Sequence, residues 1–325
     1  MVGKLTNDGI ISGSFAPVLM NQSHPTYGAS RNDLLARVLN ARGKGQYIFD
    51  GYSAGEAADW GNELEPTIIK KAAERLGIKD YKDDVDVTYE YHDLFSVSLD
   101  GILYNKKMNI TGSNNIFIMN KQNDATLKGN GIIESKLTSA MFTESPPPYR
   151  GPWQLQMQMM CYGASWGVIA TLYQGTRLVL NVYEEDKDMQ KQLIDAAKDF
   201  YSRLDGPDWY PAMDRSDAAR TWERGEDYLP SIDLEPVGDL AIQYYEAKRA
   251  IKAAEELCKN IEPKIMTHMA NHELAHLKDE YGDTILELKW PTRRLKEQPA
   301  KTTPAKPARI ERQKTLSIPA KWINQ

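Results

Sequence analysis

The spacing of apolar residues predicts two helices near the N-terminus. Within residues 28–42, four aliphatic side chains recur with a helical period and would form one buried face. Residues 54–76 repeat this pattern at greater length, and Gly77 follows as a residue typical of helix ends. We therefore expect a short helix and then a long one before any strand.

From residue 85 the pattern changes to strands that alternate with helices. Strands are expected where β-branched and aromatic residues gather, and helices where apolar residues recur with a longer period. The expected strands are 85–104, 131–137, 168–173 and 177–183, and the expected helices are 153–166 and 186–204. Residues 105–130 are polar and rich in turn residues, which favours a hairpin excursion. This mixed order over 50–205 predicts an α/β fold with a central mixed sheet flanked by helices.

The composition changes after Gly206 and suggests three parts. Residues 1–205 would form the core, 206–290 a connector and helical arm, and 291–325 a basic and flexible tail. Within the second part, residues 238–279 are expected to form a long polar helix that is interrupted near Pro263.

Overall composition is typical of a soluble globular protein. Of 325 residues, 41% are hydrophobic and 26% are charged, and no run of 18 apolar residues or secretory signal is present. The two cysteines are too few for a disulfide framework or a four-cysteine zinc site, so a reducing cytoplasm is expected. The net charge is −5, but residues 289–325 contribute +8 and the rest about −13. The net charge does not by itself indicate a nucleic-acid binder, but this uneven distribution is compatible with acidic metal ligands beside a locally basic groove.

Four weak signals together suggest a chemistry. Glu134 and Lys136 would lie on one face of a strand, because strand side chains alternate. Asp100 ends an apolar strand, where a buried carboxylate needs a partner such as a divalent ion. Glu65 lies in the long helix, and Gln154 opens a helix that carries unusually many glutamines. Each signal alone also fits a structural role: an exposed ion pair, an Asp-Gly turn, a solvated helix face or a polar helix edge.

The order of these signals resembles the PD-(D/E)-x-K nuclease superfamily, and within it the YqaJ-like viral recombinase or lambda exonuclease family. The resemblance covers roughly residues 9–185. The matching motifs are GIISGS (9–14), GNELEP (61–66), SLDG (98–101), ESKLT (134–138) and QLQ (154–156). Three features depart from the family pattern, and one is that the arginine that precedes GIISGS in the family's best-known member has no clear counterpart here. Leu99 replaces the usual proline, and the gap between Asp100 and Glu134 is long enough to require a hairpin that loops out.

The resemblance implies a restriction-endonuclease-like core and a metal-dependent hydrolysis of phosphodiester bonds. Asp100, Glu134 and the Ser135 carbonyl would bind Mg²⁺, for which Mn²⁺ can substitute, and Glu65 would be a further ligand or a nearby acid. Lys136 would orient or deprotonate the attacking water. The remaining assignments are Gln154 to position the lysine or the water, Ser12, Ser14 and Ser98 to hold the terminal phosphate, and Arg150 to contact the DNA backbone.

The resemblance also implies an activity and its partners. The expected substrate is linear double-stranded DNA with a free end, digested 5′→3′ to leave 3′ overhangs for phage-type homologous recombination. A single-strand annealing protein and a homo-oligomer, a trimer by analogy, are the expected partners, in a bacterial host cytoplasm if the chain is phage-encoded. The alternatives are a sequence- or structure-specific endonuclease on the same fold and a non-catalytic DNA-binding scaffold.

One motif suggests a different chemistry. Residues 272–276 read HELAH, the pattern of zinc proteases, and His268, His272 and His276 would line one face of a helix. The sequence offers no later histidine and no third ligand on a recognisable second helix. We therefore disfavour a metalloprotease and expect HELAH to belong to the helical arm.

Overall fold

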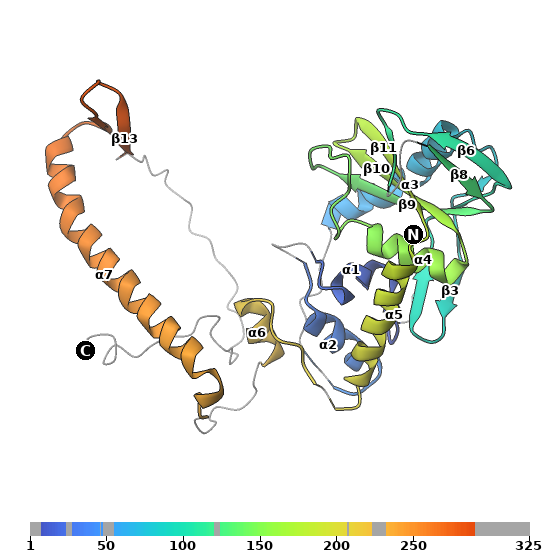
Figure 1. Cartoon of the computed structure of the whole chain (residues 1–325), viewed down its shortest axis with the longest axis horizontal. Coiled ribbons are helices and arrows are strands. Elements are labelled where there is room, and N and C mark those ends of the chain that lie inside the picture. The colour runs from blue at the N-terminus through green and yellow to red at the C-terminus, as the bar shows by residue number, and fades with distance from the viewer. Residues whose placement is uncertain are drawn as a thin grey trace, which may run out of the picture. The chain divides into compact units, whose positions relative to one another are not determined.

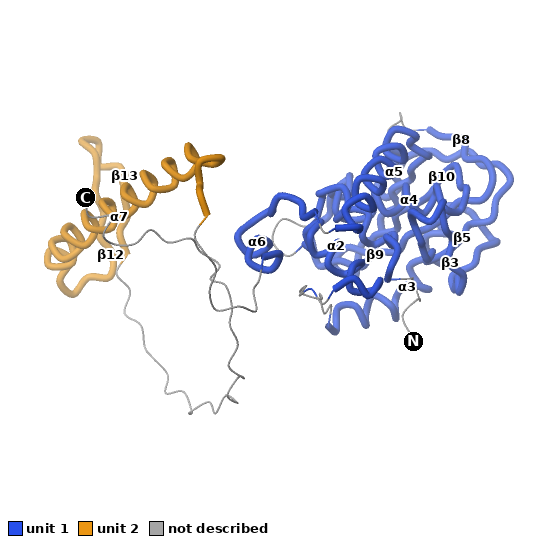
Figure 2. The backbone as a smooth tube through the Cα atoms, turned by 90° about the horizontal axis from the view of Figure 1, so that it is seen from below, with its two compact units in different colours: residues 1–223 blue, residues 224–325 orange. Residues whose placement is uncertain are grey.

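The computed structural model describes residues 8–23, 28–45, 47, 55–119, 124–206, 208–222 and 232–289. The chain forms two compact units, Met1–Glu223 and Arg224–Gln325 (Figure 2). None of the described helices is both long and apolar enough to cross a membrane.

A six-stranded mixed sheet forms the centre of the first unit (Figure 1). In spatial order its strands are β2 (Tyr81–Lys82), β5 (Gly101–Leu103), β9 (Gly131–Thr138), β10 (Trp166–Tyr173), β11 (Arg177–Glu184) and β7 (Ile116–Ile118). The pairs β9–β10 and β11–β7 are parallel, and the other three pairs are antiparallel. Burial on both faces explains why β10 reads as a nearly continuous apolar run.

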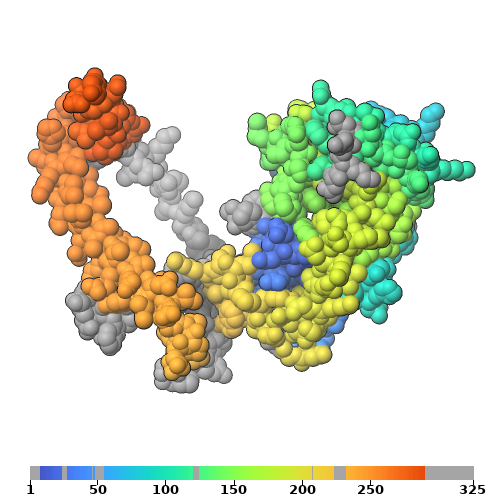
Figure 3. Space-filling model, in the orientation of Figure 1, coloured from blue at the N-terminus to red at the C-terminus, as the bar shows by residue number. Residues whose placement is uncertain are grey.

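Helices cover the two faces of this sheet, as the sequence predicts. On one face, α3 (Gly55–Leu76) packs Ile69 and Ala73 against Ile133 and Val168. On the other face, α4 (Pro152–Tyr162) contributes Leu155 and Met159 to a separate hydrophobic cluster, with α5 (Lys187–Ser202) against it. In the space-filling view, the outer side chains of α5, in yellow-green, form part of the surface of the first unit (Figure 3). The expected α/β fold is therefore confirmed.

A small three-stranded sheet lies beside α4. Its order is β1 (Ile11–Ser12), β4 (Phe95–Ser98) and β3 (Thr88–Tyr91), and β1 runs parallel to β4 with Ser12 opposite Ser96. The short helices η1 (Gly13–Phe15) and α1 (Ala16–Leu19) follow β1. Strand β4 leads directly to Asp100 and β5, so it joins the small sheet to the central one.

The first unit continues past the predicted boundary at residue 205. Helix α2 (Arg31–Ala41) begins with a capping box in which Ser30 and Asp33 exchange side-chain and backbone hydrogen bonds. Helix α6 (Arg215–Thr221) contributes Asp217, which is buried and accepts a hydrogen bond from the Ser30 hydroxyl at 2.6 Å. This contact attaches residues 215–221 to the core.

The excursion at 105–130 differs from the expected hairpin. Strands β6 (Lys107–Thr111) and β8 (Asp124–Lys128) do form a two-stranded ribbon. Between them, however, β7 leaves the ribbon and joins the edge of the central sheet beside β11. The inserted segment therefore extends the sheet and does not merely loop out.

The second unit corrects the prediction of a helix to residue 279. After η2 (Glu235–Val237), α7 (Gly238–Met269) passes through Pro263 without a break and ends at Ala270, whose φ is +49°. The chain then forms a hairpin of β12 (Leu274–Lys278) and β13 (Thr284–Lys289). HELAH thus spans a turn and a strand, because the helix ends before its first histidine.

The three histidines consequently do not share a helix face. His268 lies in the last turn of α7, His272 lies in the turn after it, and His276 pairs with Glu287 across the hairpin, 3.7 Å from Nδ1 to Oε2. Among the described residues, no group of three or more His, Cys, Asp or Glu side chains is arranged to hold a metal ion. The structure therefore does not support a zinc protease.

Candidate active site

The candidate site is built on β9, a central strand of the sheet. Glu134 and Lys136 lie on the face that α4 covers, and Ser135 lies on the opposite face with α3. Glu134 is almost fully buried, at 2% exposure, and its Oε1 accepts a hydrogen bond from Lys136 Nζ at 2.5 Å. The predicted sharing of one strand face is therefore confirmed, and the two groups are in direct contact.

Two glutamines of α4 complete the contacts of this carboxylate. Gln154 Nε2 donates to Glu134 Oε1 at 2.7 Å, and Gln158 Nε2 donates to Glu134 Oε2 at 2.6 Å. Gln154 also accepts from Lys136 Nζ through its Oε1 at 3.2 Å. One turn of helix spaces the two glutamines so that each takes one carboxylate oxygen. Glu134 and Lys136 are therefore both held in fixed orientations.

Asp100 reaches the same strand from the β4–β5 junction. Its Oδ2 accepts a hydrogen bond from the Ser135 backbone N–H at 2.8 Å. This contact follows from the antiparallel register, in which Gly101 pairs with Ile133 and Asp100 comes next. Glu65, half-buried on α3, is close enough to act electrostatically on Lys136. The other four residues of the nuclease pattern therefore lie around Lys136: Glu65, Asp100, Glu134 and Gln154.

Burial and neighbouring charges shift the pKa values of the central pair. Burial raises the pKa of Glu134 above its usual value, and the nearby Asp100 charge raises it further, against the lowering effects of Lys136 and Gln158. Burial alone would lower the pKa of Lys136, but Glu134, Asp100 and Glu65 together raise it. Lys136 is thus held as an ammonium by a group of acids.

The donors present suit a hard divalent ion such as Mg²⁺. Asp100 and Glu134 supply carboxylate oxygens. Their negative charges repel each other, and a cation between them would offset this repulsion. Mg²⁺ in proteins commonly uses one or two carboxylates and completes its shell with water and substrate phosphate. Two carboxylates with the Ser135 carbonyl therefore fit this ion, even without a third acidic ligand.

The predicted phosphate-binding serines lie next to the glutamine helix. The hydroxyls of Ser12 and Ser14 are 3.2 Å apart, at the end of β1. Between them Gly13 lies so close to α4 that a side chain there would contact Gln154 and Gln158, at 3.7 Å from each Cγ. Ser98 contributes its backbone carbonyl, which accepts from Gln158 Nε2 at 3.1 Å. The structure thus brings the three serines to the neighbourhood of the site.

Arg150 is joined to the site by a residue that sequence reasoning missed. Its guanidinium donates to Thr138 Oγ1 at 2.5 Å. Thr138 lies on the same face of β9 as Glu134 and Lys136. The alternation of side chains along a strand predicts this position from the sequence alone. Gly151, with a φ of +110°, begins α4 directly after Arg150. The end of β9 therefore holds the Arg150 side chain, and the start of α4 follows its backbone.

Gln158 is the second functional residue that the prediction did not assign. Its i, i+4 spacing from Gln154 is visible in the sequence, but only the contact with Glu134 reveals its role. Its Oε1 is buried without a hydrogen-bond partner among the described residues. The two hydrogen bonds that Gln158 Nε2 donates, to Glu134 and to the Ser98 carbonyl, therefore hold this amide in place.

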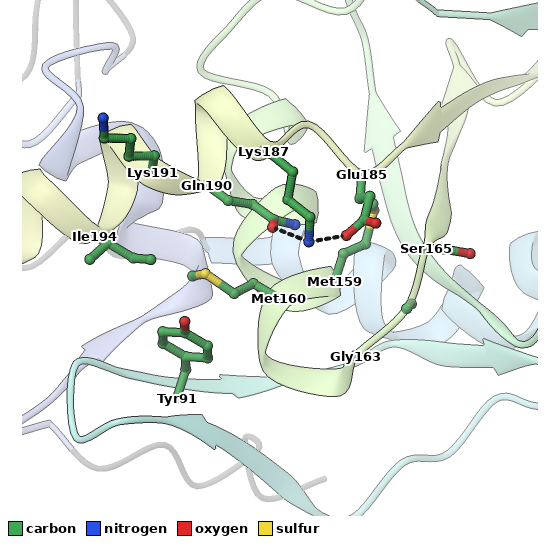
Figure 4. A pocket seen from close by; sticks show the side chains of 11 residues that line it. Tyr91, Met159, Met160, Gly163, Ser165, Glu185, Lys187, Gln190, Lys191 and Ile194 are labelled. Carbon is green, nitrogen blue, oxygen red and sulfur yellow. Dashed lines mark hydrogen bonds and ion pairs between the residues drawn. The ribbon is translucent and has the colours of Figure 1, made fainter.

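A separate cavity of about 430 Å³ lies at the other end of α4, lined by Met159, Met160 and Gly163. Figure 4 shows Lys187 pointing between Gln190 and Glu185 at its edge. The site residues do not line this cavity, so it is not part of the candidate site.

Comparisons with known proteins give structural similarities at low sequence identity. No family model matches the sequence, and no curated protein matches it either. The chain is similar to the alkaline exonuclease LHK-Exo from Laribacter hongkongensis in complex with dAMP, at 18% identity and a TM-score of 0.43 over 61% of this chain and 89% of that one. It is also similar to a phage-related exonuclease from Haemophilus somnus, at 14% identity and a TM-score of 0.40 over 60% and 94% of the two chains. These similarities are weak, so the chemistry of this chain must be inferred from its own side chains.

Proposed function

We propose that this protein is a Mg²⁺-dependent deoxyribonuclease that degrades linear double-stranded DNA. The observation that supports this most is the buried Glu134–Lys136 pair, held by Gln154 and Gln158, with Asp100 on the neighbouring strand end. A structural ion pair needs neither two glutamines nor a second acid beside it. Both suit a site that must hold a cation and a water next to a phosphate.

The residues of the chain would act on water and phosphate in distinct ways. Glu134, Asp100 and the Ser135 carbonyl would hold the metal ion, which when bound polarises the phosphate and lowers the pKa of a water. Lys136 Nζ orients the attacking water and offsets negative charge on the phosphate. Gln154 keeps this ammonium in place through its Oε1, and Gln158 aligns Glu134 and favours its charged form.

The DNA end would be held by groups around this centre. Ser12 and Ser14 supply hydroxyl donors beside α4, and Ser98 is the third serine proposed for the terminal phosphate. Arg150 supplies a positive charge at the end of β9 for the sugar-phosphate backbone. A 5′→3′ direction, 3′ overhangs for recombination, an annealing partner and a homo-oligomer remain parts of the proposal that rest on the motif resemblance.

The test is a digestion assay with the purified full chain. We expect Mg²⁺-dependent degradation of linear duplex that carries a 5′ phosphate, early loss of a 5′ label, late loss of a 3′ label, and no cutting of closed circular duplex. Lys136→Ala and Asp100→Asn should abolish activity; the asparagine can still accept the Ser135 N–H bond but lacks the charge. Lys128→Ala, which removes an exposed lysine of β8, should leave activity unchanged and is the matched control.

Two outcomes would point to other functions. Equal cutting of circular duplex would replace the exonuclease by an endonuclease on the same fold. Binding of duplex without any cutting, with or without Mg²⁺, would indicate a scaffold. Full activity of Lys136→Ala would refute the site itself.

A further inference from the structure

The long helix of the second unit carries a stripe of apolar residues with a coiled-coil period. Within α7, steps of four and three residues alternate between positions that are all apolar. These positions are Leu240, Tyr244, Ala247, Ile251, Ala254, Cys258, Ile261 and Ile265. The stripe covers 26 residues, about 39 Å of helix at 1.5 Å per residue. A heptad period sustained over nearly four repeats is the pattern by which helices pair.

This stripe lies on the surface of the described structure. Leu240, Ile251 and Ile261 are 64%, 53% and 42% exposed, and Met269 is the only buried residue of α7. Figure 3 draws the exposed side chains of α7 in orange. Pro263 falls two positions after Ile261, on the outer side of the stripe, where it leaves the apolar row continuous. An apolar row of this length favours a partner helix.

We propose that α7 pairs with α7 of a second copy of this chain as an antiparallel coiled coil. If Ile251 faces Ala254 of the second copy, every other stripe position also meets an apolar partner. Leu240 then faces Ile265, Tyr244 faces Ile261, and Ala247 faces Cys258. Each alanine meets a larger side chain, so no layer is left underfilled.

The charged residues beside the stripe support this orientation. In the antiparallel register, Lys248 flanks Glu255 of the second copy, and the symmetric pair of Glu255 with Lys248 of the second copy forms on the same flank of the stripe. In a parallel, in-register pair, Lys248 would flank Gln243 and Glu255 would flank Ala250. The parallel pair would also stack Ala247 on Ala247 and Ala254 on Ala254, leaving two thin layers. Charge and volume therefore both favour the antiparallel arrangement.

Disulfide cross-linking of the full chain tests both the pairing and its direction. In a Cys161→Ser background, Ala247→Cys places a second thiol opposite Cys258 of the other copy. We expect a disulfide-linked dimer on a non-reducing gel after mild oxidation. The background with Cys258 alone should not cross-link, and neither should Arg249→Cys, whose position lies on the outer side of the helix.

The initial rate of cross-linking at low protein concentration then tests the charge pairing. In the Ala247→Cys chain, Lys248→Glu or Glu255→Lys alone should slow cross-linking about tenfold, because two attractive pairs become repulsive. The double exchange should restore the original rate. Ile251→Asp should abolish cross-linking while the helical content seen by circular dichroism is retained.

Three results would overturn the proposal. Absence of a dimer from the Ala247→Cys chain means that something other than a second α7 covers the stripe, including another segment of the same chain. Equally fast cross-linking through Cys258 alone means a parallel pair. Identical rates in all four charge variants mean that Lys248 and Glu255 do not face each other.

Discussion

The two glutamines Gln158 and Gln156 provide the sharpest test of the candidate site. Both are buried, at 1% and 0% exposure, and both make two hydrogen bonds. Gln158 bonds to Glu134 and to the Ser98 carbonyl, whereas Gln156 bonds only to backbone groups of residues 184 and 186. Replacing each by leucine removes a similar number of bonds, but only one replacement touches Glu134.

The expected cost in stability is similar for the two variants. Gln158→Leu loses a bond to a carboxylate, worth roughly 1.5–3 kcal/mol, and a neutral bond worth roughly 0.5–1.5 kcal/mol. Removing its unpartnered Oε1 offsets roughly 1–3 kcal/mol, so the free energy of unfolding should fall by about 1 kcal/mol. Gln156→Leu loses two neutral bonds, and its free energy of unfolding should fall by about 1–3 kcal/mol. Urea denaturation measures both values.

The expected effect on activity separates the variants. Without Gln158, the pKa of Glu134 should rise further, because one group that favours its charged form is gone. Activity that needs ionised Glu134 should then fall on the acidic limb of the pH–rate profile, by about tenfold for each unit that the pKa rises, and this limb should move to higher pH. Gln156→Leu should keep the wild-type profile. Equal activities in the two variants, at matched stability, would refute the role given to Gln158.

Three further predictions concern Arg150, Asp217 and the cysteines. Arg150→Ala should raise the KM for linear duplex more than it lowers kcat, and should reduce the salt dependence of binding by about one phosphate contact; an unchanged salt slope would contradict the backbone contact. Asp217→Ala should lower the free energy of unfolding by about 3 kcal/mol, because the buried carboxylate accepts hydrogen bonds from Ser30 and from Met213 N–H. Asp214→Ala is the control: it removes an exposed helix cap and should lower the free energy of unfolding by about 1 kcal/mol. Burial raises the pKa of the Cys161 thiol to about 12, so at pH 8 and low protein concentration a thiol reagent should label exposed Cys258 rapidly and half-buried Cys161 much more slowly. The Cys161 thiol ionises at lower pH in the unfolded chain than in the folded one, so the stability that it contributes should be lost as the pH rises from about 9 toward 12. Denaturation at alkaline pH, compared with Cys161→Ala, would measure this loss.

The elements that the sequence predicts well are those whose pattern is set locally. The long helix appears at 55–76 and ends where Gly77 adopts a φ of +72°. Glu134 and Lys136 share a strand face because alternation is a property of any strand. The strand β9 and the helix α4 therefore bring the site together much as expected.

The errors have physical causes that act over longer distances. β7 was expected to belong to a hairpin, but its partner β11 lies more than 60 residues further along the chain, and no local pattern reveals such a pairing. Gln158 shows its role only once α4 lies over β9. The prediction of a helix through HELAH was wrong, although the sequence contains a turn signal directly after it. Residues 279–283 read DEYGD and form the turn of the hairpin, in which Asp279 accepts hydrogen bonds from the N–H groups of Tyr281 and Asp283.

The charges around Lys136 account for the expected need for a cation. Glu65, Asp100 and Glu134 all act on this lysine, so a fully ionised group of three acids and one ammonium carries a charge of −3 + 1 = −2. A DNA phosphate is also negative and would be repelled by such a group. Burial shifts Glu134 toward its neutral form, which lessens this repulsion but also removes a ligand. A divalent cation held by Asp100 and Glu134 would relieve this repulsion with both acids ionised, and Lys136 would then face the phosphate. The proposed dependence on metal therefore rests on the charges that surround this one lysine, and none of the HELAH histidines is among the groups that act on it.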